Sequence, residues 1–253
     1  MPDYVVFLLV GLVVFITHYQ EGITGFGCTV LAVPFVTMLV GLDVAVPMLV
    51  IIGTLIAIGI VLMDRRGVAW GEYGIIVVLM MIGVPIGLKA SSLLPETTLR
   101  WVLAGFMVVV GIHGIIKQGL KYSAPEKMSR TKRALLSLFV PVGGIMQGAF
   151  GSGGPLLVIY ATGAMPNKSV FRGTLCIVWI TLNSIIIGTW VKNGVITGEI
   201  LRLTGIALPF MLAGMFLGNR AHYRVNEVAF RRIVYGVLIL SGIVLITQLL
   251  KHP

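Results

Sequence analysis

The sequence predicts an all-α polytopic membrane protein built from two inverted-topology repeats. The composition is 57% hydrophobic and only 11% charged, and the mean hydropathy is +1.02, values far outside those of an ordinary soluble domain. Apolar runs near membrane-spanning length recur along the whole chain, between short loops that hold most of the charge. Glycine-rich breaks interrupt these runs at related places in the two halves, at residues 22–27 and 148–155.

Each repeat is predicted to contain a broken or re-entrant helical hairpin followed by three transmembrane helices, which gives about eight transmembrane elements in all. The first repeat, 1–117, is expected to hold helices at about 3–20, 24–40, 43–63, 73–93 and 98–117. The second repeat, 134–253, is expected to hold helices at about 134–147, 152–164, 170–191, 200–219 and 230–250. The polar linker 118–133 joins the repeats within a single transmembrane domain, 1–253.

Aligned polar residues and loop charge both support this organisation. Residues that align keep the same order in the two halves: Gly27 with Gly151, Glu72 with Glu199, and Glu96 with Glu227. Suppose that each hairpin enters and leaves on the same side of the membrane. Most of the 19 lysines and arginines then lie on one side of the membrane, in the loops around 64–72, 117–133, 164–172 and 220–232. The positive-inside rule then favours inverted repeats, a cytoplasmic linker and both termini outside.

Several other classes of protein do not fit the composition. The net charge of +10 lies in loops beside apolar spans, so it indicates membrane orientation and no nucleic acid. Cys28 and Cys176 lie inside apolar segments without CxxC spacing, and we expect no disulfide and no metal site. The sequence has no HExxH, phosphate loop or GxSxG, so we expect neither an enzyme nor a cofactor. The start, Met1-Pro2-Asp3-Tyr4, lacks a basic region and a cleavage site, so we expect no removable signal peptide.

Breaking a helix in hydrocarbon is costly unless the break binds something, because every backbone group there needs a partner. A helix that restarts after a break points its N–H groups and the positive end of its dipole at the gap. Two such ends meeting near the midplane would form an anion site made largely of backbone. The candidate substrate-binding residues at the breaks are Gln20, Thr24, Gly25, Gly27, Gln147, Gly151, Ser152, Gly153 and Gly154. The alternative is that the glycines only let helices pack closely.

Glu21 is an acidic residue that the hydropathy places within a membrane segment, and His18 precedes it by about one helical turn. An ionisable group within the membrane is a functional hypothesis by default. Glu21 could take up a proton and so couple transport to the proton gradient, with His18 as a second candidate. The alternative is that the first arm ends at Gln20 and that both side chains reach interfacial water.

Two further candidates lie outside the breaks. Arg172 begins the helix after the second hairpin and could offer a fork of donors to an oxyanion, although it could equally mark a cytoplasmic loop. Asn183 lies within a full crossing and could line the path, or it could form a hydrogen bond to a neighbouring helix.

The two breaks and their flanks resemble the sulfite exporter TauE/SafE family of membrane permeases. Residues 22–34, GITGFGCTVLAVP, are similar to the family's glycine-rich opening that ends in Val-Pro, although Cys28-Thr29 stands where many members have further glycines. Residues 148–155, GAFGSGGP, with FRGT at 171–174, are similar to its more strongly marked second motif. The likeness covers essentially the whole chain. It implies transport of small sulfur-containing anions such as sulfite or organosulfonates, usually export across a prokaryotic inner membrane.

The residues and the resemblance together predict a secondary transporter that works by alternating access, with an anion held between the two glycine-broken hairpins. Its expected partners are the small anion and membrane lipid, and its expected location is a prokaryotic plasma membrane. The alternative is a passive anion channel or a non-transporting membrane scaffold that contains the same breaks.

Overall fold

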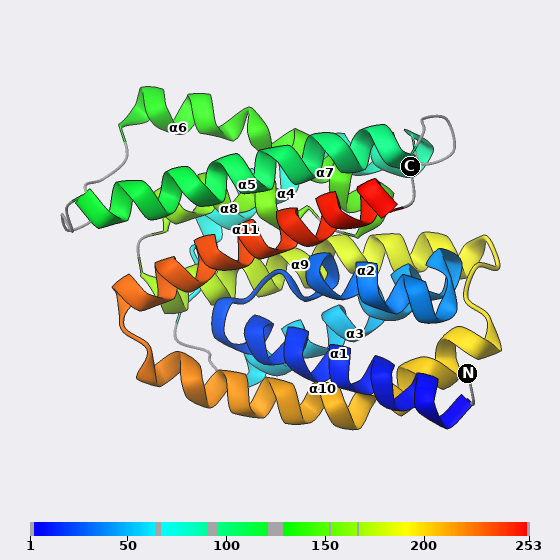
Figure 1. Cartoon of the computed structure of the whole chain (residues 1–253). Coiled ribbons are helices and arrows are strands. Elements are labelled where there is room, and N and C mark those ends of the chain that lie inside the picture. The colour runs from blue at the N-terminus through cyan, green and yellow to red at the C-terminus, as the bar shows by residue number, and fades with distance from the viewer. Residues whose placement is uncertain are drawn as a thin grey trace. The chain divides into compact units, whose positions relative to one another are not determined.

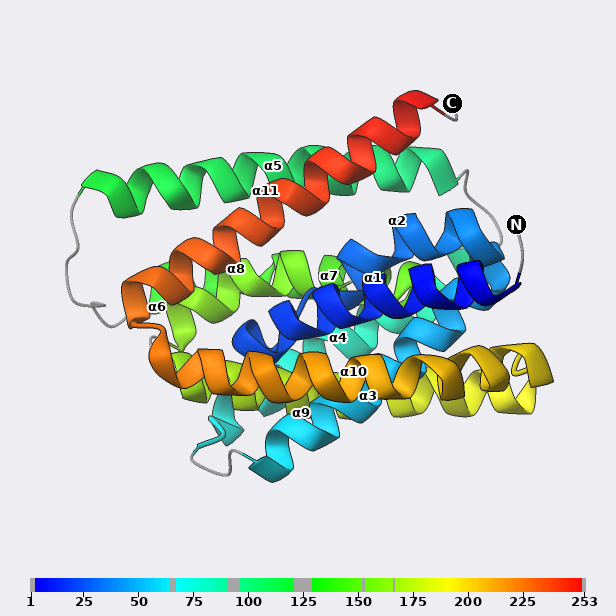
Figure 2. The ribbon, with the colours of Figure 1, turned by 60° about the horizontal axis from the view of Figure 1, so that its bottom comes forward.

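The structure is a computed structural model that describes residues 3–63, 67–90, 96–120, 129–151, 153–165 and 167–251. These residues are helical throughout, joined by turns and short connections (Figures 1 and 2). The helices are α1 Asp3–Thr24, α2 Cys28–Val40, α3 Leu42–Met63, α4 Trp70–Ala90, α5 Glu96–Leu120, α6 Arg130–Ser137, α7 Phe139–Phe150, α8 Gly154–Ala164, α9 Lys168–Lys192, α10 Gly198–Arg224 and α11 Glu227–Lys251.

The helices form two compact units, and each unit takes helices from both halves of the sequence. The first unit comprises Met1–Tyr73 and Arg172–Arg224, so it contains α1, α2, α3, most of α9, and α10. The second unit comprises Gly74–Phe171 and Val225–Pro253, so it contains most of α4 together with α5, α6, α7, α8 and α11. The two glycine breaks therefore lie in different units.

Six helices in the described part of the chain are long and apolar enough to cross a membrane. They are Asp3–Thr24, Leu42–Met63, Trp70–Ala90, Lys168–Lys192, Gly198–Arg224 and Val228–Leu250. The outer face of α1 shows why they suit lipid, because Leu8, Leu12 and Ile16 follow one another every fourth residue and are more than half exposed. Val10 and Val14 are buried on the opposite side. A helix that is apolar on both its exposed and its buried faces belongs in a membrane, and the chain is a polytopic membrane protein.

In the first unit, α1 packs along α10, and the two run side by side in both views (Figures 1 and 2). Two glycines spaced four apart on α10 bring the backbones together. A Cβ atom at Gly214 would lie 2.6 Å from the Phe15 carbonyl oxygen, and one at Gly218 would lie 2.2 Å from the Tyr19 carbonyl oxygen. No larger side chain fits at either position, as is common where membrane helices pack closely.

The same contact recurs in the second unit between α4 and α7. A Cβ atom at Gly83 would lie 2.0 Å from the Pro141 carbonyl oxygen, and one at Gly87 would lie 2.0 Å from the Ile145 carbonyl oxygen. Both glycines and both carbonyls are again four residues apart, as in the first unit. We call these two contacts, α1 with α10 and α7 with α4, the glycine seams.

The first arm of each hairpin differs from the expectation. α1 runs to Thr24 instead of stopping near residue 20, and its 22 residues span about 33 Å, enough to cross the hydrocarbon core. In the second hairpin the expected helix 134–147 begins earlier, at Arg130, and ends later, at Phe150. Ser129 starts α6 by accepting a hydrogen bond from the Lys132 N–H, so residues 130–133 of the expected linker are helical.

A turn at Leu138 separates α6 from α7. Pro141 explains it, because proline has no N–H to donate to the carbonyl four residues earlier and its ring crowds that carbonyl. α7 and α8 contain 12 and 11 residues, about 18 and 16 Å, so each is too short to cross the hydrocarbon alone.

Candidate functional site

The first break is a tight turn between α1 and α2. Gly25 and Gly27 have φ of +79° and +98°, the left-handed region that residues with a Cβ adopt at a cost. Gly25 closes α1 by donating its N–H to the Glu21 carbonyl at 2.6 Å. A side chain at Gly25 is also blocked, since its Cβ would lie 2.7 Å from Cγ of Arg172.

Side chains from α9 and α10 cap the carbonyl groups at this end of α1. Arg172 donates from Nη1 to the Gly22 carbonyl at 2.8 Å, and the Nδ1 of His222 lies 2.7 Å from the Ile23 carbonyl oxygen. Trp179 donates its indole N–H to the Gly25 carbonyl at 3.0 Å. The last carbonyls of a helix have no partner within it and carry the negative end of its dipole. Three donors, one of them cationic, therefore replace the water that a soluble protein would use.

Arg172 is fully buried and lies within α9, not in a loop. Its guanidinium group also donates to Oδ1 of Asn219 at 3.0 Å and lies 5.5 Å from the ring centre of Tyr223. The structure therefore places this cation against the first break. His222 and Trp179 were not predicted as site residues, because nothing in their own segments indicates contact with a helix end more than 150 residues away.

Gln20 and Thr24 shape the turn itself. The Nε2 of Gln20 donates to Oγ1 of Thr24 at 2.6 Å and to the Phe26 carbonyl at 3.1 Å. The Thr24 hydroxyl lies 3.0 Å from the same Phe26 carbonyl. Both predicted site residues thus stabilise the backbone between the two glycines.

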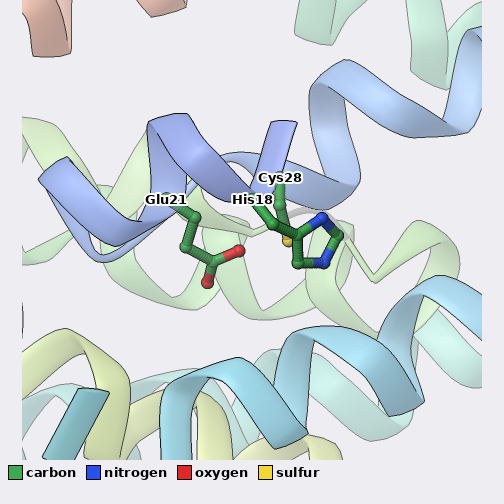
Figure 3. Close-up of side chains that lie close together, drawn as sticks. All are labelled: His18, Glu21 and Cys28. Carbon is green, nitrogen blue, oxygen red and sulfur yellow. The ribbon is translucent and has the colours of Figure 1, made fainter. Parts of the chain in front are cut away.

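His18, Glu21 and Cys28 form a buried cluster beside the first break (Figure 3). His18 is 0%, Glu21 2% and Cys28 3% exposed, so the prediction that both α1 side chains reach interfacial water is wrong. A carboxylate oxygen of Glu21 lies within 4.8 Å of the thiol sulfur of Cys28, the first residue of α2. An acidic side chain of the protein therefore lies beside the start of α2, where the sequence predicted an external anion.

The second break has a similar turn with neutral chemistry. Gly151 has φ of +64° and closes α7 by donating to the Gln147 carbonyl at 2.9 Å. The Oε1 of Gln147 accepts from the Gly153 N–H at 2.8 Å, next to the start of α8 at Gly154. A Cβ atom at Gly153 would lie 2.4 Å from the Gly143 carbonyl oxygen, so the position has no room for a side chain.

Each break begins with a left-handed glycine that donates to the carbonyl four residues before it, Gly25 to Glu21 and Gly151 to Gln147. The two turns then differ, because Gly27 is left-handed with φ of +98° whereas Gly153 has φ of −73°. Four residues before the left-handed glycine, the first break has the acidic Glu21 and the second has the amide of Gln147.

One predicted residue, Asn183, is not part of either turn. Asn183 is buried within α9, 6% exposed, and belongs to the first unit. Ser152 lies outside the described residues.

One comparison with known proteins decides the family. The family model described as sulfite exporter TauE/SafE matches residues 8–245 of the 253. The chain belongs to the TauE/SafE family. The match takes in both breaks, four of the six candidate spans completely, and most of the first and the last span, which agrees with a membrane permease. Neither a curated protein nor a solved structure matches the chain.

Proposed function

We propose that this TauE/SafE protein is a secondary transporter that moves small sulfur-containing anions, such as sulfite or organosulfonates, by alternating access and in exchange with or together with a proton. The family supports the class of solute and a location in a prokaryotic inner membrane. The chemistry of the two breaks supports the division of roles between anion and proton.

The second break is the proposed anion site. At the start of α8 the Gly153 N–H is bonded to Gln147 and Pro155 has no N–H, so the donors proposed for an anion are the N–H groups of Gly154 and Leu156, at the positive end of the helix dipole. Its cap, Gln147, is a neutral amide and leaves that dipole without a balancing charge. Gly153 and Gly154 are buried, so an anion bound against them is removed from water and gains more from each donor. This neutral, glycine-lined helix start is the observation on which the proposal depends.

The first break is the proposed proton site. Glu21 is 2% exposed, and a carboxylate buried in a membrane protein is costly unless it is paired or exchanges a proton. Its charge also opposes a second anion at the start of α2. We therefore assign Glu21 to proton coupling and not to substrate binding, and His18 to its immediate surroundings.

The inverted repeat is part of the same proposal. The recurrence of the glycine seams and of the two turns supports a duplication, and the distribution of lysine and arginine among the loops supports opposite insertion of the halves. Arms that enter from opposite sides are what alternating access requires of a duplicated transporter.

Flux measured in proteoliposomes tests the proposal. Sulfite and a short organosulfonate should cross in a saturable manner, and an imposed pH gradient should accelerate their movement in one direction. In Glu21→Gln, saturable anion flux should persist while the response to the pH gradient is lost. The matched control is Glu199→Gln, which removes an exposed carboxylate in the first turn of α10 and should leave both properties unchanged.

Other results would reject specific parts of the proposal. Non-saturable flux would identify a passive channel, and the absence of flux for every sulfur anion tested would favour a membrane scaffold. A normal pH response in Glu21→Gln would remove Glu21 from coupling and leave the anion site at the second break to be judged on its own.

A further inference from the structure

Three side chains that the sequence does not link come together across the first break. His18 and Glu21 are three residues apart on α1, so they share one face of the helix. The turn at Gly25 and Gly27 brings Cys28, at the start of α2, beside them (Figure 3). A nitrogen, an oxygen and a sulfur atom, one from each residue, lie within 4.8 Å of one another.

We propose that His18, Glu21 and Cys28 form a binding site for a divalent d-block metal ion of the Zn²⁺ class. Two atoms bound to one tetrahedral zinc ion lie about 3.5 Å apart, given bond lengths of 2.0–2.3 Å. The three ligand atoms are therefore at most about 1.3 Å farther apart than a bound ion requires.

The hydrogen bonds of His18 prepare it for a metal. Its Nδ1 lies 2.8 Å from the Val14 carbonyl oxygen, so this nitrogen carries the proton and the lone pair of the neutral ring is on Nε2. Nε2 is buried and has no hydrogen-bond partner within the described residues. Metal-bound histidines usually donate their other ring N–H to a carbonyl in this way.

Glu21 and Cys28 provide charge and selectivity. Oε2 of Glu21 is likewise buried without a partner in the described part of the chain, so one carboxylate oxygen remains available. When an ion binds, the Cys28 thiol loses its proton to water and the thiolate coordinates the metal. The ionised carboxylate and thiolate then balance a charge of two. Nitrogen and sulfur ligands favour zinc-like ions over Mg²⁺ or Ca²⁺, which prefer oxygen.

The position of the site suggests its effect. Two ligands lie on α1 and the third on α2, so a bound ion would tie the two arms of the first hairpin together. The ion would also coordinate the Glu21 carboxylate, which the proposed function assigns to proton coupling. Metal binding does not depend on that assignment, because it can be measured without any transport assay.

Co²⁺, a spectroscopic substitute for Zn²⁺, provides the test on the purified full-length chain in detergent. We expect one Co²⁺ per chain, a thiolate-to-metal charge-transfer band in the near ultraviolet, and loss of that band when Zn²⁺ is added. Cys28→Ser should abolish the band, whereas Cys176→Ser, which alters the other cysteine of the chain, should retain it. Glu21→Gln and His18→Gln should each weaken Co²⁺ binding by roughly tenfold or more.

A measurement on the wild-type chain covers the case in which Cys28→Ser does not fold. Zn²⁺ should slow alkylation of Cys28, followed by mass spectrometry, and leave the rate at Cys176 unchanged. The proposal is overturned if the wild type shows no charge-transfer band, if Cys28→Ser retains it, or if Zn²⁺ protects both cysteines equally.

Discussion

The first and second breaks both begin at a left-handed glycine, Gly25 or Gly151, but they are stabilised by different means. In the first, donors from distant helices, Arg172, Trp179 and His222, cap the end of α1. In the second, the bond from Gly153 to Gln147 stays within one hairpin. Four residues before its left-handed glycine, the first break has the carboxylate of Glu21, whereas the second has the amide of Gln147. The two breaks thus differ in charge and in the origin of their hydrogen-bond partners, and the proposed roles of proton and anion depend on this difference.

The strongest test of this difference is Arg172→Met. The variant removes the buried donor to Gly22 and Asn219 while keeping an unbranched apolar stem, so the Gly22 carbonyl loses its cap. Because hydrogen bonds to charged groups contribute about 3 kcal/mol at most, we expect a loss of roughly that size in the free energy of unfolding. Thermal unfolding in detergent measures it, with Arg220→Met on the exposed side of α10 as a control. Equal melting temperatures for the two variants would show that the first break does not depend on Arg172.

Gly25→Ala should have the next largest effect. The new methyl group meets Arg172 at 2.7 Å, and the left-handed backbone is itself unfavourable by about 1–2 kcal/mol. Gly194→Ala is the control, because Gly194 follows α9 with φ of +70° and has nothing within 4 Å of a Cβ atom. Gly25→Ala should therefore unfold at a lower temperature than Gly194→Ala. If the two variants melt together, the contact with Arg172 contributes nothing and only backbone strain remains.

The smallest expected effect comes from making the second break resemble the first. Gln147→Glu places a carboxylate at the start of α8, which should repel the anion and raise the KM for sulfite roughly tenfold, or about 1.4 kcal/mol. Flux in proteoliposomes measures the KM, and Gln147→Met controls for the loss of the hydrogen bond alone. A KM that rises equally in both variants would mean that the amide positions the backbone and that charge at this place is unimportant.

Much of the architecture followed from apolar periodicity and glycine placement. Both breaks, the burial of Glu21 and the order of the helices were predictable, because hydrocarbon admits few alternatives to a paired helical backbone. The start of α6 was not, since its cap, Ser129, lies in a polar segment that looks like a linker. Arg172 was recognised as a candidate, but its partner at Gly22 is set by tertiary packing between residues 150 positions apart. Cys28 lies beside His18 and Glu21 because the chain turns at the left-handed Gly25 and Gly27, and the conformation of these glycines could not be predicted from the sequence.

The glycine seams have a mechanical consequence. At Gly214 and Gly218 the backbone of α10 is in close contact with carbonyl groups of α1. Rotating α10 about its axis would move a larger side chain, such as Met215 or Leu217, into the space that these glycines leave. Sliding along the axis meets the same obstacle. We therefore expect α1 to move with α10, and α7 with α4, as rigid pairs. Any bending that transport requires would then occur in the segments that connect these pairs to the other helices.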